Sequence, residues 1–170
     1  MKTVNLAILV ENTPGVLTRV SGLIARRDFN IESISAGYTE ESDVTRINIE
    51  VSVRDDHELD MLCRQVGKLV DIIKVVNLGK VKSIVRELVL LKIKADIESL
   101  GKIRNIVDIF RGKIVDISPE NVVIELTGDQ GKVEAIIGML DEFEIIEIAR
   151  TGAIALSRGP VPVKHMEGEQ

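Results

Sequence analysis

The sequence predicts an α+β protein made of two tandem ferredoxin-like βαββαβ domains with antiparallel sheets. Three observations predict this class. Alternating apolar residues, typical of half-buried strands, repeatedly give way to apolar residues at helical spacing. The order strand, helix, strand, strand, helix, strand then occurs twice along the chain. The 170 residues are 45% hydrophobic, which is enough apolar material for two small cores.

The first predicted strand and helix lie within residues 4–27. Apolar residues alternate over 4–10, which is the period of a strand. Thr13 and Pro14 then place a capping hydroxyl before a proline at the first helical position. Two arginines at 26–27 end the helix, where positive charge interacts favourably with the helix dipole.

A hairpin, a helix and a strand complete the first unit. Strands are expected over residues 30–38 and 44–53, joined by the polar turn 39–43. Acidic residues from Asp55 onward begin a second amphipathic helix, and residues 72–78 read as the fourth strand. This is the complete βαββαβ order.

The second unit repeats that order with its own patterns. The predicted strands are residues 88–95, 114–117, 122–126 and 144–156, the last broken near Thr151-Gly152, and the predicted helices are 97–110 and 133–140.

These boundaries predict four parts of the chain. They are a first domain over residues 1–78, a linker over 79–86, a C-terminal ferredoxin-like domain over 87–158 and a frayed polar tail over 159–170.

Composition excludes several classes of partner. The net charge of −5 offers no basic field for phosphates or anionic lipids, and 2% aromatic residues leave few rings to stack on bases. We therefore expect neither nucleic acid nor membrane as a partner. The chain runs from Met1 directly into the first strand, so we expect no leader segment and a cytoplasmic location.

Catalytic and metal-binding constellations are not evident. His57 and His165 have no second ligand at metal spacing, and Cys63 lies in a helical apolar pattern that favours the core. A metal cluster is a weaker interpretation than helix capping for the acidic residues Asp55, Asp56, Glu58 and Asp60. We predict no catalytic residue and no metal ligand in this chain.

The segment 128–132 superficially resembles a phosphate-binding loop. Its glycines are too close together, and Val133 stands where a hydroxyl would hold magnesium. A turn between a strand and a helix is the better interpretation.

The turn from Glu11 to Leu17 is the exception. It leaves a helix N-terminus open, and the amides of Gly15, Val16 and Leu17 can face a carboxylate. Asn12 adds an amide side chain, while Leu17 and Ile31 offer an apolar wall. A free amino acid suits such a site, although an ordinary capped helix has the same local pattern.

At this turn the chain resembles the ACT domain, an amino-acid sensor with the same βαββαβ order. The resemblance then narrows to the small (regulatory) subunit of acetohydroxyacid synthase, also called acetolactate synthase. It rests on the stretches LVEN at 9–12, NIES at 30–33, RELVL at 86–90, IFRGKIVD at 109–116 and LSRG at 156–159. These stretches occur in family order over nearly the whole chain.

The resemblance implies a subunit without chemistry of its own. Such a subunit activates a large catalytic subunit, which carries thiamine diphosphate, magnesium and FAD, and conveys feedback inhibition by valine or a related branched-chain amino acid. It also implies a homodimer or larger assembly with effector sites between ACT domains. The implied effector residues are Asn12, Pro14, Gly15, Val16 and Leu17 from one chain and Asn30 and Ile31 from the other.

Two departures from the family pattern affect the expected sites. Pro14 removes one amide, which lowers the number of donors at the turn. The second domain has residues 94–98 in place of the glycine turn, and Glu98 would oppose a ligand carboxylate, so we expect one effector site per chain.

Three other functions stay open. The main alternative is a tandem ACT sensor that acts on another enzyme or on a transcriptional partner. An RNA-binding ferredoxin-like protein is disfavoured by the negative charge, and a stand-alone enzyme by the absence of an acid, base and nucleophile set.

Overall fold

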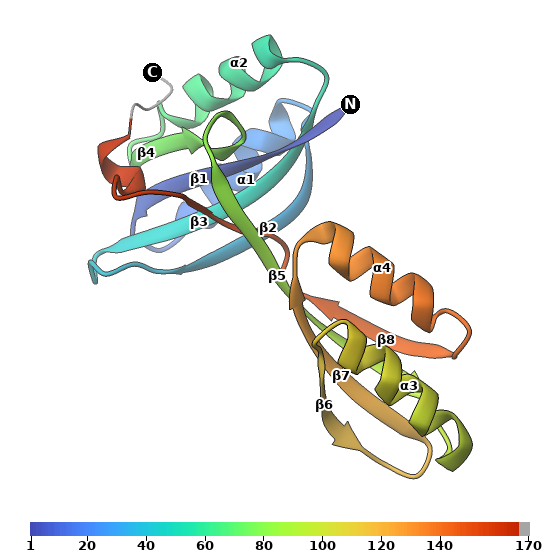
Figure 1. The fold of residues 1–170 in the computed structure, drawn as a ribbon. Coiled ribbons are helices and arrows are strands. Elements are labelled where there is room, and N and C mark those ends of the chain that lie inside the picture. Colours follow the sequence, from blue (N-terminus) through green and yellow to red (C-terminus); the bar gives the residue numbers. More distant parts are fainter. Residues whose placement is uncertain (167–170) are drawn as a thin grey trace. The chain divides into compact units, whose positions relative to one another are not determined.

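The computed structural model describes residues 1–166 and divides the chain into two compact units (Figure 1). One unit contains residues 1–84 together with residues 152–166, and the other contains residues 85–151. Each unit has a hydrophobic core of its own.

A four-stranded antiparallel sheet forms the first unit, in the order β2-β3-β1-β4. Its strands are β1 (Lys2–Glu11), β2 (Asn30–Tyr38), β3 (Val44–Val53) and β4 (Ile72–Asn77). Its helices are α1 (Val16–Arg26) and α2 (Asp56–Val66). The strand order places β2 and β4 at the two edges, while β1 and β3 are buried between them.

The alternation of apolar residues in β1 and β3 produces the first core. Val4 pairs with Val51, Leu6 with Ile49 and Ile8 with Ile47, so these side chains share one side of the sheet. Helix residues such as Ile24, Leu62 and Cys63 complete the same cluster, and all three are fully buried. The structure thus confirms Cys63 as a core residue.

The second unit repeats the strand order as β6-β7-β5-β8, and the short strand β9 also pairs with β5. Its elements are β5 (Ser83–Lys94), α3 (Ile97–Ile109), β6 (Lys113–Ile117), β7 (Asn121–Gly128), α4 (Gln130–Leu140) and β8 (Ile145–Arg150). Strand β9 (Ile154–Ser157) lies in the segment that belongs to the first unit. Two tandem ferredoxin-like units are therefore present, as predicted.

The ends of the second unit differ from the predicted boundaries. The expected linker 79–86 contains the end of a 3-10 turn, η1 (Leu78–Lys80), and the first residues of β5. The expected break near Thr151-Gly152 is present between β8 and β9. Gly152 has a φ of +75°, and a Cβ there would lie 2.7 Å from the Ser33 Cβ, so only glycine fits without displacement.

Residues 152–166, the C-terminal segment, are packed against the first unit, and the expectation of a frayed tail over 159–166 is not met (Figure 1). The reason is that Val163 is 4% exposed and Ala155 1% exposed, so the segment has apolar anchors of its own. A second 3-10 turn, η2 (Val163–His165), contacts β4. The remaining residues of the predicted tail, 167–170, lie outside the described residues.

Candidate functional site

The turn between β1 and α1 begins α1 with an exposed glycine. Gly15 is the N-cap residue of α1, with a φ of +83° and a ψ of −1°, and it supplies no side-chain cap. Two hydrogen bonds fix the approach to the turn: the Glu11 amide donates to the Asp71 carbonyl at 2.9 Å, and the Asn12 amide donates to the Asp43 carbonyl at 2.8 Å.

Arg19 holds the turn in shape from inside the helix. Its Nε donates to Asp71 Oδ2 at 2.7 Å, and its Nη2 donates to Thr13 Oγ1 at 3.3 Å. Thr13 Oγ1 in turn donates to Asp71 Oδ1 at 3.2 Å. The Arg19 hydrogen bond holds the pKa of the Asp71 carboxyl below its usual range, although burial works in the opposite direction. Asp71 therefore stays ionised and anchors the turn.

The three backbone amides predicted to face a carboxylate, those of Gly15, Val16 and Leu17, do not all have a free hydrogen. The Val16 amide donates to the Thr13 carbonyl at 3.3 Å and the Val16 side chain is 8% exposed, so Val16 belongs to the core and not to a ligand surface. This corrects the expectation that three amides face a carboxylate. The amides of Gly15, Leu17 and Thr18 have no acceptor within the described residues. Three amides, of which that of Thr18 was not among the predicted donors, therefore remain at this helix N-terminus.

Asn12, Pro14 and Leu17 lie at the surface beside those amides. All three are exposed, and the Leu17 side chain is 42% exposed. The turn thus offers backbone amide donors, one amide side chain and one aliphatic side chain, a set that can bind a carboxylate with a small apolar body.

Asn30 and Ile31 are not brought to this turn within one chain. Asn30 pairs with Ser52, which pairs with Thr3 at the start of β1, whereas the turn follows the end of β1. Strand geometry separates the two groups by roughly 25–30 Å. Asn30 donates from Nδ2 to Glu32 Oε1 at 2.7 Å, and Ile31 packs against the first core.

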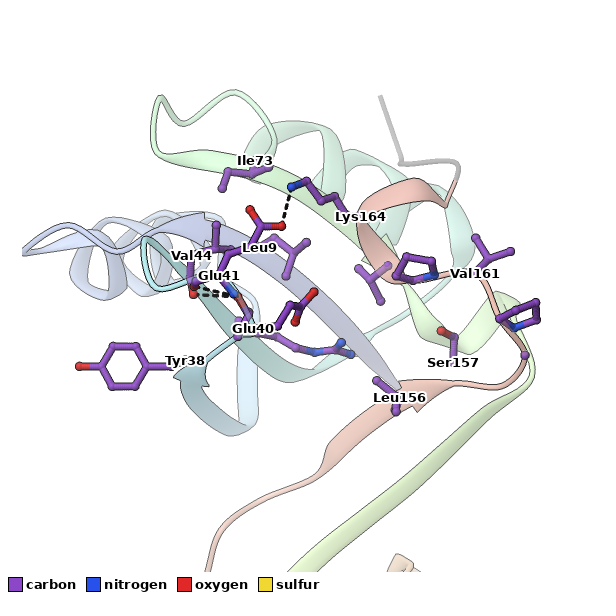
Figure 2. Close-up of a pocket in the computed structure, with 16 residues that line it drawn as sticks. Leu9, Tyr38, Glu40, Glu41, Val44, Ile73, Leu156, Ser157, Val161 and Lys164 are labelled. Atoms are coloured by element: carbon purple, nitrogen blue, oxygen red, sulfur yellow. Dashed lines mark hydrogen bonds and ion pairs between the residues drawn. The ribbon is translucent and has the colours of Figure 1, made fainter.

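A hollow that the sequence did not predict lies under the C-terminal segment (Figure 2). Its volume is about 500 Å³. The lining includes Leu9, Arg46 and Ile73 from the sheet and Leu156 and Val161 from the C-terminal segment. Apolar residues at 156, 161 and 163 were the sequence signal that this end of the chain has an apolar surface to cover.

Arg46 joins the sheet to the C-terminal segment at this hollow. Its Nε donates to Asn48 Oδ1 at 3.2 Å, and its Nη2 donates to the Ala155 carbonyl. Burial lowers the pKa of the Arg46 guanidinium, and the charge of Glu40 acts against that shift. The guanidinium therefore serves as a structural anchor.

The remaining candidate sites have structural explanations. Asp55 is the N-cap of α2 and accepts from the Glu58 amide at 2.9 Å, which confirms helix capping. Asp129 caps α4 by accepting from the Lys132 amide at 2.9 Å, which confirms the turn at 128–132. Within residues 1–166, no group of three or more His, Cys, Asp or Glu side chains could hold a metal ion, and no helix is long and apolar enough to cross a membrane.

Comparisons with known proteins match both halves of the chain. Residues 6–74 match the model of the "AHAS small subunit-like ACT domain", and residues 86–159 match that of the "Small subunit of acetolactate synthase". The acetolactate synthase small subunit of Mycobacterium bovis is 45% identical over 94% of each chain. The probable acetolactate synthase small subunit of Archaeoglobus fulgidus is 45% identical over 91% of this chain and 96% of its own.

The solved structures agree with the sequence comparisons. The crystal structure of the acetolactate synthase small subunit from Thermotoga maritima is similar with a TM-score of 0.86 and 40% identity, covering 95% of this chain and 100% of that chain. Sequence and fold agree over both units, so the chain belongs to the acetolactate synthase small-subunit family and carries an N-terminal ACT domain.

Proposed function

We propose that this chain is a non-catalytic subunit that activates the large catalytic subunit of acetolactate synthase and conveys feedback inhibition by valine or another branched-chain amino acid. The observation that carries the effector proposal is the open N-terminus of α1 at Gly15, where the amides of Gly15 and Leu17 lack an acceptor among the described residues. Membership of the small-subunit family supports the catalytic partner.

In this proposal the amides of Gly15 and Leu17 bind the effector carboxylate. Asn12 lies beside them and can accept from the effector's ammonium group or donate to its carboxylate. The exposed Leu17 side chain contacts the aliphatic body of the effector. Pro14 contributes shape and no hydrogen-bond donor.

A homodimer would supply the rest of the site. Strand β2 is an edge of the first sheet, and in an antiparallel pairing of two β2 strands the partner's Asn30 end lies beside the Tyr38 end of this chain. Tyr38 pairs with Thr45, which pairs with Val10, so that end of β2 lies near the turn after β1. Asn30 and Ile31 of one chain would then approach the turn of the other.

Thiamine diphosphate, magnesium and FAD are assigned in this proposal to the large catalytic subunit. No residue of this chain is assigned to hold them. The domain roles are likewise proposals: effector binding and dimerisation belong to residues 1–78, and regulation of the partner involves residues 87–158.

The test compares Asn12→Ala with Asn105→Ala, an exposed asparagine of α3 that serves as the matched control. Acetolactate formation by the reconstituted complex is measured at increasing valine. We expect Asn12→Ala to raise the half-inhibitory valine concentration about tenfold or more, because a hydrogen bond to a charged group contributes roughly 1.5–3 kcal/mol. Activation without valine should be unchanged. Equal valine sensitivity of both variants and the parent protein would place the effector elsewhere.

A further inference from the structure

The turn between β2 and β3 is bound on both of its sides. On one side the Asn12 amide donates to the Asp43 carbonyl at 2.8 Å, next to the proposed effector turn. On the other side Lys164 of the C-terminal segment forms an ion pair with Glu41 at 2.6 Å (Figure 2). Residues 39–43, the hairpin turn, therefore connect the effector turn with the C-terminal segment.

Internal hydrogen bonds connect the residues of the hairpin turn to one another. Thr39 Oγ1 accepts from the Glu41 amide at 3.1 Å and donates to the Val44 carbonyl at 3.1 Å. The Val44 amide donates to the Glu41 carbonyl at 3.1 Å. A displacement at Glu41 is for this reason passed to Asp43, which lies two residues away.

The C-terminal segment is fixed at separate points. The Ala153 amide donates to Ser33 Oγ at 3.3 Å, the Ala155 carbonyl accepts from Arg46, and Val163 is buried. Between these anchors the segment covers one side of the hollow of about 500 Å³. Leu156 is 57% exposed and Val161 47% exposed, so this part is not close-packed on the sheet. Local release of its end requires the loss of few contacts.

We propose that the Lys164–Glu41 ion pair, the clasp, couples docking of the C-terminal segment to the state of the effector turn. When the segment is docked, the clasp holds the hairpin turn, and Asp43 holds the Asn12 backbone in place. When the segment is released, both restraints weaken. In this proposal the C-terminal segment exchanges between the docked and the released state. An effector that orders the turn favours the docked state.

The regulatory part of this inference rests on the proposed function, whereas the coupling of the turn to the clasp does not. Coupling is reciprocal, so an effector that favours the docked segment is itself bound more tightly when the segment is docked. A half-exposed ion pair typically contributes up to about a fivefold change in an equilibrium constant, and that is the expected size of the coupling.

Charge reversal gives the test, with hydrogen exchange of the full-length protein as the measurement. The variants are Glu41→Lys, Lys164→Glu and the double variant. Without effector, each single reversal should accelerate exchange of the hydrogen-bonded amides of Asn12 and Val16, and of Ala153 and Arg158 in the C-terminal segment, about two- to fivefold, because the clasp is lost. The double variant should restore exchange most of the way toward the parental rate, because the pair forms in the opposite orientation while the charges of Asp43 and Glu40 oppose a carboxylate at position 164. The matched control is Lys92→Glu, which disrupts the similarly exposed pair of Lys92 with Glu147 at 3.1 Å in the second unit.

The same samples with added valine separate the two hypotheses. Valine should slow exchange in both segments of the parent protein and of the double variant, and slow it less in the single reversals. If the single reversals leave exchange at Asn12 unchanged, or if the double variant does not restore it, the coupling is refuted whatever valine does. If valine, leucine and isoleucine bind to none of the proteins while the reversals still act as described, the proposed effector function fails and the coupling stands.

Discussion

At the scale of single residues, Gly15 determines which substitutions the turn between β1 and α1 accepts. Its φ of +83° lies in the left-handed region, and a Cβ there would lie 3.1 Å from Arg19 Nη1. Gly15→Asp should therefore cost more than the roughly 1 kcal/mol expected at an ordinary helix N-terminus, because the left-handed region is unfavourable for residues with a Cβ. Any loss of feedback in that variant would combine strain with repulsion of the effector carboxylate.

A pair of alanine substitutions measures this strain. Gly15→Ala should lower the free energy of unfolding by roughly 1–2 kcal/mol, because L residues are unfavourable in the left-handed region. Gly22→Ala is the control in the same helix, where the new Cβ meets nothing within 4 Å. It should stabilise by roughly 0.5–1 kcal/mol through helix propensity. Chemical denaturation of both variants measures the change in the free energy of unfolding, which should be negative for Gly15→Ala and positive for Gly22→Ala. Equal changes would contradict the strain at Gly15.

Asp71 gives the turn a dependence on pH. Its pKa is lowered in the folded protein, first by the hydrogen bond from Arg19, so its stabilisation is present above the ordinary carboxyl pKa of about 3.9. That stabilisation is lost as the pH falls through the folded pKa, because the unfolded chain takes up the proton first.

The variant Asp71→Asn tests this dependence. At neutral pH it should unfold at a lower temperature than the parent protein, and the difference should shrink below a pH of about 4. Asp116→Asn, at an exposed carboxylate of β6, is the control. A difference that stays constant down to a pH of about 3 would show that Asp71 acts through packing and not through its charge.

At the scale of elements, the C-terminal segment depends on a few buried residues within an otherwise exposed stretch. Val163→Ala should lower the free energy of unfolding by about 1.5 kcal/mol, since it removes two buried carbon groups at about 0.8 kcal/mol each. Val161→Ala, two residues earlier and 47% exposed, should change it by less than about 0.5 kcal/mol. The measurement is hydrogen exchange of the β1 amides, which reports the stability of the first unit alone. Equal effects at the two positions would mean that the segment does not pack through η2.

At the scale of the whole molecule, the first unit is assembled from both ends of the chain. A fragment of residues 1–84 lacks Val163 and the other anchors, so it should be less stable than a fragment in which a Gly-Ser linker joins 1–84 to 152–166. We expect a difference of roughly 2 kcal/mol or more, because burial of one valine side chain alone contributes about 1.5–3 kcal/mol. Denaturation midpoints of the two fragments, measured at equal concentration, give the comparison. Identical midpoints would show that the first unit is complete without the C-terminal segment.

The sequence by itself determined both βαββαβ units, because period-2 and helical patterns are local and occur in strict succession from Val4 to the strand that ends at Arg150. It also located the open turn at Gly15, the capping acids that begin at Asp55 and the turn at 128–132, whose local hydrogen bonds span only a few residues. Local chemistry was enough for these features.

Only the tertiary structure decided how the turn is held and where the C-terminal segment goes. Arg19 meets Asp71 across 52 residues and Lys164 meets Glu41 across 123, and no local pattern selects one partner among so many charged residues. Val16 has helical spacing that suits either a ligand surface or a core, and the direction of α1 over the sheet assigned it to the core. Side chains that are distant in the sequence pair only when the whole chain has folded. The folded path depends on all residues together, so no local pattern predicts such a pair.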